Sequence, residues 1–201
     1  DMANRHPVLQ WYDIICRYKS EKLKEPEKVT GIPMSGAMGA YMGLAYNLYL
    51  LAHNNEIQSK LIKRLKNPSL FTGAYYETVV AAIFIKAGFE LEFENEDDTQ
   101  NSHCEFTAIF KESGKRFSVE AKAREPYKST AIITNQLYNA LRKEANHPRA
   151  VFIDINVPET ADNPQDLKWL QHAIQSLRSK EDTLTIGGLP APEAYVFVNN
   201  H

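Results

Sequence analysis

The spacing of hydrophobic residues changes abruptly at Gly88. Before this glycine, the segment 73–87 carries hydrophobic residues at helical spacing, and a glycine after the last of them commonly ends a helix. After it, Phe89-Glu90-Leu91-Glu92-Phe93-Glu94 alternates strictly between hydrophobic and acidic residues, as a half-buried strand does. The sequence therefore predicts a helix, with Thr72 as its N-cap, that leads directly into a sheet.

More strands and helices are expected after this first strand. Two strands over about 104–111 and 116–124 are joined by a turn at Ser113-Gly114. They are followed by a helix over about 130–145, a strand over 149–157, a helix over about 164–179 and a last strand over 194–198. This order predicts an α/β domain with a mixed central sheet flanked by helices.

The chain before this domain is expected to be helical. Helices are predicted over about 7–24, 35–53 and 54–66, with Ser35 capping the second. Either Asn54 or Asn55 would cap the third. We divide the chain into a helical region over 1–70, packed on the core, and an α/β domain over 71–201.

The second of these helices is rich in small and aromatic residues. We interpret them as packing in a core, with contact to a second copy or to a partner protein as the alternative. The residues concerned are Gly36, Gly39, Gly43, Tyr41, Tyr46 and Tyr49.

Composition and length fit a globular protein that does not cross a membrane. The 201 residues, 43% hydrophobic and 24% charged, suffice for one domain with a helical extension. The longest apolar stretch, 79–87, is too short to span a bilayer and contains Lys86. No signal peptide is visible, so the cytoplasm is the expected location. Cys16 and Cys104 form no CxxC pair, and we expect both to stay reduced.

The charge balance limits how the chain could bind nucleic acid. It carries 23 basic and 25 acidic residues, a formal net charge of -2, whereas nucleic-acid binders often have a basic excess. Catalytic carboxylates would themselves lower the net charge. We therefore do not expect tight, indiscriminate binding to nucleic acid at physiological salt.

Acidic and basic side chains are expected to gather on one face of the strand 118–124. Because side chains alternate along a strand, Glu120 and Lys122 project from the same face. Pairing with the preceding strand through the turn at Ser113-Gly114 would place Glu105 opposite Lys122 and diagonal to Glu120. Two carboxylates and an ammonium group would then lie within reach of one ligand.

A third carboxylate is expected from the helix before the sheet. Glu77 lies at the edge of the apolar stripe that includes Val80 and Phe84. It is also close to the helix start, where the helix dipole favours a negative charge. The sequence thus predicts that Glu77 lies beside the strand carboxylates.

Such a set of side chains suits metal-dependent phosphodiester chemistry. Two or three carboxylates bind a hard cation such as Mg²⁺ through oxygen and leave several water molecules in place. The cation polarises a phosphate oxygen and lowers the pKa of a bound water that can attack phosphorus. A lysine at the same place can orient or deprotonate that water and stabilise charge on the phosphate.

The pattern resembles the PD-(D/E)XK nuclease superfamily, which has the restriction-endonuclease-like fold. The resemblance covers about 71–157 and rests on Glu77 in a helix, Glu105 in a strand and the tripeptide Glu120-Ala121-Lys122. It implies an αβββαβ core and an endonuclease that hydrolyses phosphodiester bonds, with DNA as the expected substrate. Gln136 is similar to a glutamine that some branches place on the next helix, and Glu77 would complete or support the site.

The resemblance also implies a role for the strand residues. Glu105 and Glu120 would bind the metal, Mg²⁺ or Mn²⁺, and Lys122 would serve catalysis. The main-chain carbonyl of Ala121 would add a metal ligand. The sequence departs from the family pattern in two places, because Glu105 replaces the usual Asp and Cys104 replaces the preceding Pro.

Two alternatives remain open from the sequence alone. The longer Glu105 side chain and the acidic balance favour a nuclease-fold module that binds nucleic acid or protein with weak turnover or none. A subunit whose helical region recruits a partner protein, which then supplies the grip on the substrate, is the second alternative.

Overall fold

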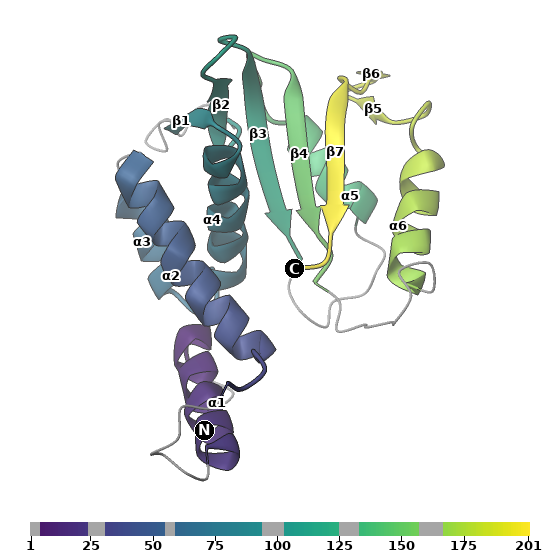
Figure 1. The fold of residues 1–201 in the computed structure, drawn as a ribbon. Coiled ribbons are helices and arrows are strands. Elements are labelled where there is room, and N and C mark those ends of the chain that lie inside the picture. Colours follow the sequence, from purple (N-terminus) through teal and green to yellow (C-terminus); the bar gives the residue numbers. More distant parts are fainter. Residues whose placement is uncertain (1–4, 24–30, 55–58, 94–102, 125–132, 157–166) are drawn as a thin grey trace. The chain divides into compact units, whose positions relative to one another are not determined.

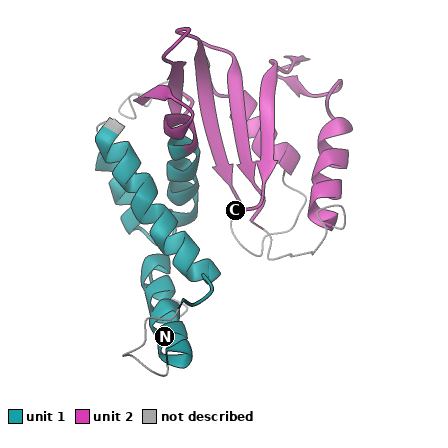
Figure 2. Cartoon of the chain, in the orientation of Figure 1, with its two compact units in different colours: residues 1–82 teal, residues 83–201 magenta. Residues whose placement is uncertain are grey.

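The computed structural model describes residues 5–23, 31–54, 59–93, 103–124, 133–156 and 167–201. The chain forms two compact units, residues 1–82 and 83–201 (Figure 2). The division falls inside one helix, so that Glu77 belongs to the first unit. Within the described ranges, no helix combines the length and apolar composition that a membrane span requires.

The first unit is helical, as the sequence predicts (Figure 1). It contains α1 (Pro7–Lys22), α2 (Gly36–Asn54), α3 (Ser59–Lys66) and most of α4 (Phe71–Lys86). An aromatic cluster joins the ends of α1 and α4, because the Trp11 ring lies edge-on to Phe71 and to Tyr75, at 5.4 Å between centroids in each case. His6 adds a hydrogen-bonding contact of 2.8 Å from Nε2 to the carbonyl oxygen of Leu65.

Two of the predicted helix starts can be compared with the structure. Ser35 is confirmed as a cap, since its Oγ accepts a hydrogen bond of 3.3 Å from the Met38 amide. Thr72 is not a cap, because α4 already begins at Phe71 after a turn over 67–70. That turn is closed by Asn67, whose side chain accepts a hydrogen bond from the Ser69 amide at 3.0 Å.

The predicted cap of the third helix differs as well. Asn54 is the last residue of α2 and is therefore helical, which excludes it as the cap of α3. Asn55 lies outside the described residues.

The tyrosines of α2 do not pack in a core. Tyr41, Tyr46 and Tyr49 are 37%, 52% and 55% exposed, and the rings of Tyr46 and Tyr49 stack on each other. The interpretation as core packing is therefore wrong for these three residues. Contact with a second copy or a partner protein stays a prediction.

The second unit is an α/β layer structure with a mixed five-stranded sheet in the order β1-β2-β3-β4-β7 (Figure 1). β1 with β2 and β2 with β3 pair antiparallel, while β3 with β4 and β4 with β7 pair parallel. The strands are β1 (Phe89–Phe93), β2 (Phe106–Phe110), β3 (Arg116–Ala123), β4 (Arg149–Asp154) and β7 (Ala194–Asn199). The expected α/β class and mixed sheet are thus confirmed.

Helices α5 (Ile133–Leu141) and α6 (Lys168–Arg178) flank the sheet and share a hydrophobic core with β4. The Trp169 ring of α6 packs against this core. The buried residues of the core are Ile133, Leu137, Ala140, Leu141, Val151, Ile153, Ile155 and Ala173. This side of the sheet is therefore closed around the middle of β4.

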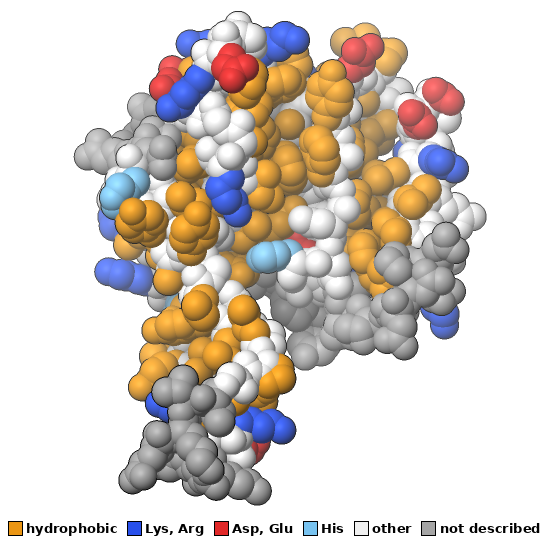
Figure 3. Space-filling model, in the orientation of Figure 1, with side chains coloured by type: hydrophobic (Ala, Val, Ile, Leu, Met, Phe, Trp, Pro, Cys, Tyr) orange, Lys and Arg blue, Asp and Glu red, His pale blue; other side chains and the backbone are white. Residues whose placement is uncertain are grey.

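The opposite side of the sheet carries aromatic rings. Phe84, in the last turn of α4, meets Phe89, Phe106 and Phe152 edge-on at 5.1, 5.8 and 5.6 Å. Figure 3 shows hydrophobic side chains gathered over β3, β4 and β7 on the side away from α5. Tyr195 of β7 is 62% exposed.

Two turns follow from glycine chemistry. Gly88, with φ 86°, ends α4 and lets β1 begin one residue later, as predicted. Gly187 and Gly188 have φ of 59° and 83° and join β5 (Thr185–Ile186) to β6 (Leu189–Pro190). Positive φ at both central residues is the geometry of a tight hairpin turn, which explains why two glycines stand there.

Helix α5 is shorter than predicted. It ends at Leu141, although the sequence predicts helix to about residue 145. The reason is that Glu144 pairs its backbone with His103 in a short parallel bridge, and its carbonyl oxygen accepts a contact of 3.6 Å from the Cys104 thiol. The expected helix start near residue 130 lies outside the described residues.

Candidate functional site

The β2–β3 pairing decides which side chains meet. Phe106 pairs with Val119, and the Glu105 amide donates to the carbonyl oxygen of Val119 at 3.0 Å. Glu105 lies directly before this pair, just ahead of the start of β2, and Glu120 follows it on β3, so the two glutamates lie level with each other. The predicted register, with Glu105 opposite Lys122, is therefore wrong by two residues.

The turn between these strands accounts for the difference in register. The Phe110 amide donates to the Lys115 carbonyl oxygen at 2.8 Å, so that the connection consists of residues 111–114. Gly114, with φ 67°, is the last residue of this connection, whereas the prediction placed it at the centre. The observed register brings Glu105 closer to Glu120 than the predicted one.

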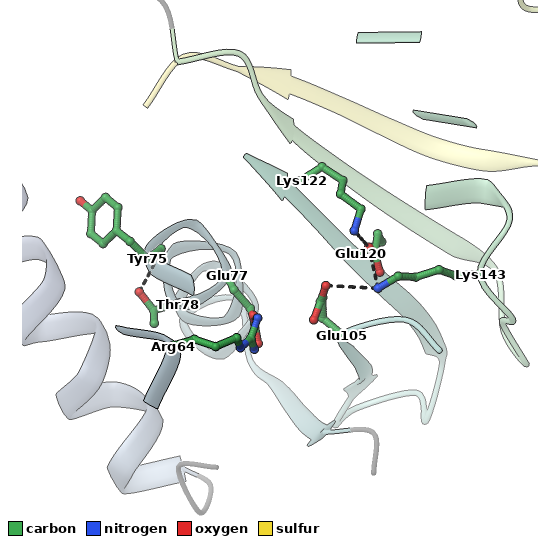
Figure 4. A network of polar contacts seen from close by, with 8 residues as sticks. All are labelled: Arg64, Tyr75, Glu77, Thr78, Glu105, Glu120, Lys122 and Lys143. Atoms are coloured by element: carbon green, nitrogen blue, oxygen red, sulfur yellow. Dashed lines mark hydrogen bonds and ion pairs between the residues drawn. The ribbon is translucent and has the colours of Figure 1, made fainter. Parts of the chain in front are cut away.

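A lysine that the sequence analysis did not consider joins the two glutamates. The Nζ of Lys143 lies 3.3 Å from Oε1 of Glu105 and 2.9 Å from Oε1 of Glu120. Lys122 also forms an ion pair with Oε1 of Glu120. Figure 4 shows the Lys143 side chain reaching between the two carboxyl groups. The site thus contains two carboxylates and two ammonium groups.

The backbone around Lys143 is held from two sides. Its carbonyl oxygen accepts a hydrogen bond of 3.2 Å from Nη2 of Arg149, at the start of β4. The next residue, Glu144, is held by the bridge to His103 and by the Cys104 thiol. The position of Lys143 is therefore set by the segment just before Glu105 and by β4, which a local sequence motif does not reveal.

Burial and like charge dominate the electrostatics of Glu120. Its residue is 1% exposed, and burial together with the nearby Glu105 carboxylate raises its pKa, while Lys122 and Lys143 oppose the rise. Burial alone would lower the pKa of Lys143, but the carboxylates of Glu105 and Glu120 outweigh it and raise that pKa. Lys143 is therefore held as a cation beside a carboxylate that is costly to ionise.

Cys104, directly before Glu105, is part of the same environment. Burial, and next the Glu120 carboxylate, raise the pKa of its thiol to about 12. A thiol with so high a pKa is a poor nucleophile near neutral pH. Cys104 is a free, buried cysteine, which agrees with the expectation that it stays reduced.

Some of the oxygen atoms in the site suit a hard divalent ion. Among the described residues, the buried Oε2 of Glu120 has no hydrogen-bonding partner, which leaves a carboxylate oxygen available to a ligand. The carbonyl of Val119 points toward β2. Because backbone carbonyls two residues apart in a strand point the same way, the carbonyl of Ala121 also points to that side, beyond the last β2–β3 pair. Two carboxylates and one main-chain carbonyl, completed by water, match the oxygen ligands that Mg²⁺ takes.

The set of protein ligands is nevertheless small. Within the described ranges, no group of three or more His, Cys, Asp and Glu side chains could hold a metal ion. Any ion at Glu105 and Glu120 would therefore depend on water and main-chain oxygen for most of its coordination.

Glu77 has a strong partner in its own unit. It is 3% exposed, and its Oε2 lies 2.7 Å from Nη2 of Arg64 on α3. Figure 4 shows the Arg64 side chain against that of Glu77. This ion pair gives Glu77 a structural role in the helical unit. Its expected part in the metal site stays a prediction.

Gln136 also stays a prediction. It lies on α5 and is partly buried, and its Oε1 has no hydrogen-bonding partner among the residues that the structure describes. A buried amide oxygen without a partner is unusual, because such groups are normally satisfied. This feature is compatible with a ligand-binding role.

Comparison with known proteins yields no relatives. No protein-family model matches the chain, and no curated protein or solved structure matches it either.

Proposed function

We propose that the chain is a divalent-metal-dependent nuclease that hydrolyses phosphodiester bonds, with DNA as its substrate and a restriction-endonuclease-like fold. The observation that carries the proposal is that Glu105 and Glu120 lie close enough to share one cation, the Lys143 ammonium. The Oε2 of Glu120, which has no hydrogen-bonding partner in the described part of the chain, supports it, because a buried carboxylate oxygen of this kind suits a metal ligand.

Each residue of the site has a distinct part in this proposal. Glu105, Glu120 and the Ala121 carbonyl would hold the ion, which when bound supplies an activated water and polarises the phosphate. Lys122 would donate hydrogen bonds to the non-bridging phosphate oxygens and to the attacking water, which stabilises the charge that develops on phosphorus oxygens. The water oxygen bonds to phosphorus and the water gives up one proton to solvent, the P–O ester bond breaks, and the leaving oxygen takes up a proton from solvent.

The test is a cleavage assay with the full chain on supercoiled plasmid DNA and on RNA, in Mg²⁺, in Mn²⁺ and in a chelator. We expect DNA cleavage that requires the metal and that falls by at least about a hundredfold in Lys122→Ala. Lys115→Ala, a change at an exposed lysine in the β2–β3 turn, is the control and should cleave as the wild type does. Equal cleavage by Lys122→Ala and the wild type would refute the proposal.

One observation favours a second candidate function, a nuclease-fold module that binds nucleic acid or protein without turnover. The two ammonium groups of Lys122 and Lys143 balance the two carboxylates, so that the formal charge of the four groups is zero. A site without net negative charge attracts a divalent ion weakly. Isothermal titration with Mn²⁺ separates the two candidates, because a protein that binds no metal has no route to metal-dependent hydrolysis.

A further inference from the structure

Lys143 occupies the place that a metal ion would need. An ion bound to Oε1 of Glu105 and Oε1 of Glu120 would lie between these two atoms, and the Nζ of Lys143 lies there, 3.3 and 2.9 Å from them. Mg²⁺ binds oxygen at about 2.0–2.1 Å, so an ion and the ammonium group cannot share this position. Binding of the ion to these two oxygens and the observed ion pairs of Lys143 therefore exclude each other.

We infer that Lys143 is an internal cation that competes with a divalent ion for the Glu105–Glu120 carboxylate pair, and that metal binding displaces its ammonium group. This inference rests on the proposed function, because it concerns how metal binding is controlled at the proposed nuclease site. It makes Lys143 a residue that sets metal affinity, distinct from Lys122, whose ion pair in the site is with Glu120.

Charge supports the competition. With Lys143 in place, the carboxylates of Glu105 and Glu120 and the ammonium groups of Lys122 and Lys143 have a formal charge of zero. Once the Lys143 ammonium leaves, the remaining three groups carry a formal charge of -1. The attraction between this charge and a divalent ion is strong in a buried site, where water screens poorly.

The structure also provides a way for Lys143 to leave. Its backbone is fixed by Arg149 and by the bridge between Glu144 and His103, so displacement does not require the chain to move. Its side chain is 19% exposed and has four flexible methylene groups. Rotation of the side chain alone can therefore carry the ammonium group to solvent or to a phosphate oxygen of a bound substrate.

The test is isothermal titration of the full chain with MnCl₂ and with MgCl₂. Lys143→Met keeps an unbranched side chain, one heavy atom shorter than that of lysine, and removes its charge, and we expect it to lower the metal Kd about tenfold or more. Lys143→Arg keeps the charge and should not tighten binding, and Lys115→Met, at the exposed lysine, should match the wild type. An unchanged or weaker affinity in a folded Lys143→Met protein would overturn the inference.

A second measurement uses the wild-type chain and does not depend on any variant being stable. Nitrogen-15 NMR of lysine ammonium groups should show the Lys143 signal protected from exchange with water, because its Nζ is held by two carboxylates. Addition of MgCl₂ should remove this protection. A Lys143 signal that stays protected when the titrations show the site saturated would overturn the inference.

The outcomes for the inference and for the proposed function can be told apart. If Lys143→Met binds metal more tightly but neither it nor the wild type cleaves DNA, the inference holds and the nuclease proposal fails. If the wild type cleaves DNA but Lys143→Met binds metal no better, the nuclease proposal holds and the inference fails. If neither protein binds metal, both fail.

Discussion

The buried Glu77 of the helical unit and the buried Glu120 of the sheet unit differ in what surrounds them. Glu77 forms an ion pair with the guanidinium group of Arg64, at 2.7 Å. Glu120 lies beside a second carboxylate, Glu105, and meets two ammonium groups. Both residues are less than 4% exposed. An ion pair between opposite charges serves the fold, whereas two neighbouring acids are costly to the fold and suited to binding a ligand.

The largest effect on stability is expected at Glu77. Glu77→Ala removes the carboxylate that pairs with the Arg64 guanidinium, and loss of one member of a buried ion pair costs about 3 kcal/mol. Because Arg64 is 30% exposed, water offsets part of the loss, and the cost lies at the low end for such pairs. Urea unfolding monitored by circular dichroism measures it.

Glu77→Gln is the matched variant for this comparison. It keeps the shape and one oxygen acceptor for Arg64, and we expect it to be less destabilising than Glu77→Ala. The structural assignment of Glu77 would be wrong if Glu77→Gln folds as well as the wild type but loses more than about tenfold in metal affinity or cleavage. That result would assign Glu77 to the metal site.

A smaller effect of opposite sign is expected at Glu120. Burial raises the pKa of this carboxyl, so the folded state binds its proton more tightly than the unfolded state does. The wild type therefore loses the stability linked to this carboxyl as the pH rises from the pKa of the unfolded state through the raised pKa of the folded state. Glu120→Gln has no such loss, and above that range it should unfold at a higher urea concentration than the wild type.

The pH dependence identifies the cause of this difference. The advantage of Glu120→Gln should shrink as the pH falls toward the unfolded pKa, about 4.3 for a glutamate, because the wild-type carboxyl is then protonated. Glu181→Gln, at an exposed position, should show no advantage at any pH. A Glu120→Gln protein less stable than the wild type at pH 7 would show that the ionised Glu120 carboxylate stabilises the fold, contrary to the raised pKa.

The smallest effect is expected at a third buried acid, Asp154 at the end of β4. Its Oδ1 accepts hydrogen bonds from the amides of Asn156 and His201, at 3.1 and 3.0 Å. Burial raises its pKa, and these neutral donors oppose the rise. Asp154→Asn keeps the acceptor, and thermal unfolding should place it within about 0.5 kcal/mol of the wild type. Asp154→Ala should cost about 1 kcal/mol more, and equal stability of the two variants would mean that the two hydrogen bonds contribute nothing.

The spacing of hydrophobic residues predicted the fold class, because this spacing can be read from residues that are neighbours in the sequence. The alternation over 89–94 and the glycine before it identified α4 and β1 to within two residues, and the parallel strand β4 followed from a run of hydrophobic residues. Ends that depend on tertiary partners were less predictable. Helix α5 stops at Leu141 because Glu144 pairs with His103, some forty residues away in sequence.

In the candidate site, too, local patterns predicted some residues, whereas others are placed only by tertiary contacts. Alternation placed Glu120 and Lys122 on one face, and the hairpin brought Glu105 to them, although two residues out of register. Lys143 carries no local signal, because its place between the carboxyl groups depends on how the chain returns to the sheet after α5. The buried ion pair of Glu77 with Arg64 depends on α3 packing beside α4, which helical periodicity does not specify.

The distribution of tryptophan has a practical consequence. The chain has two tryptophans, and each compact unit contains one, Trp11 against the rings of Phe71 and Tyr75 and Trp169 against the core beneath α6. A Trp11→Phe protein therefore reports by fluorescence on the sheet unit, and a Trp169→Phe protein reports on the helical unit. The sequence of events during denaturation, and whether the halves melt together or separately, can be followed with these natural probes and no attached dye.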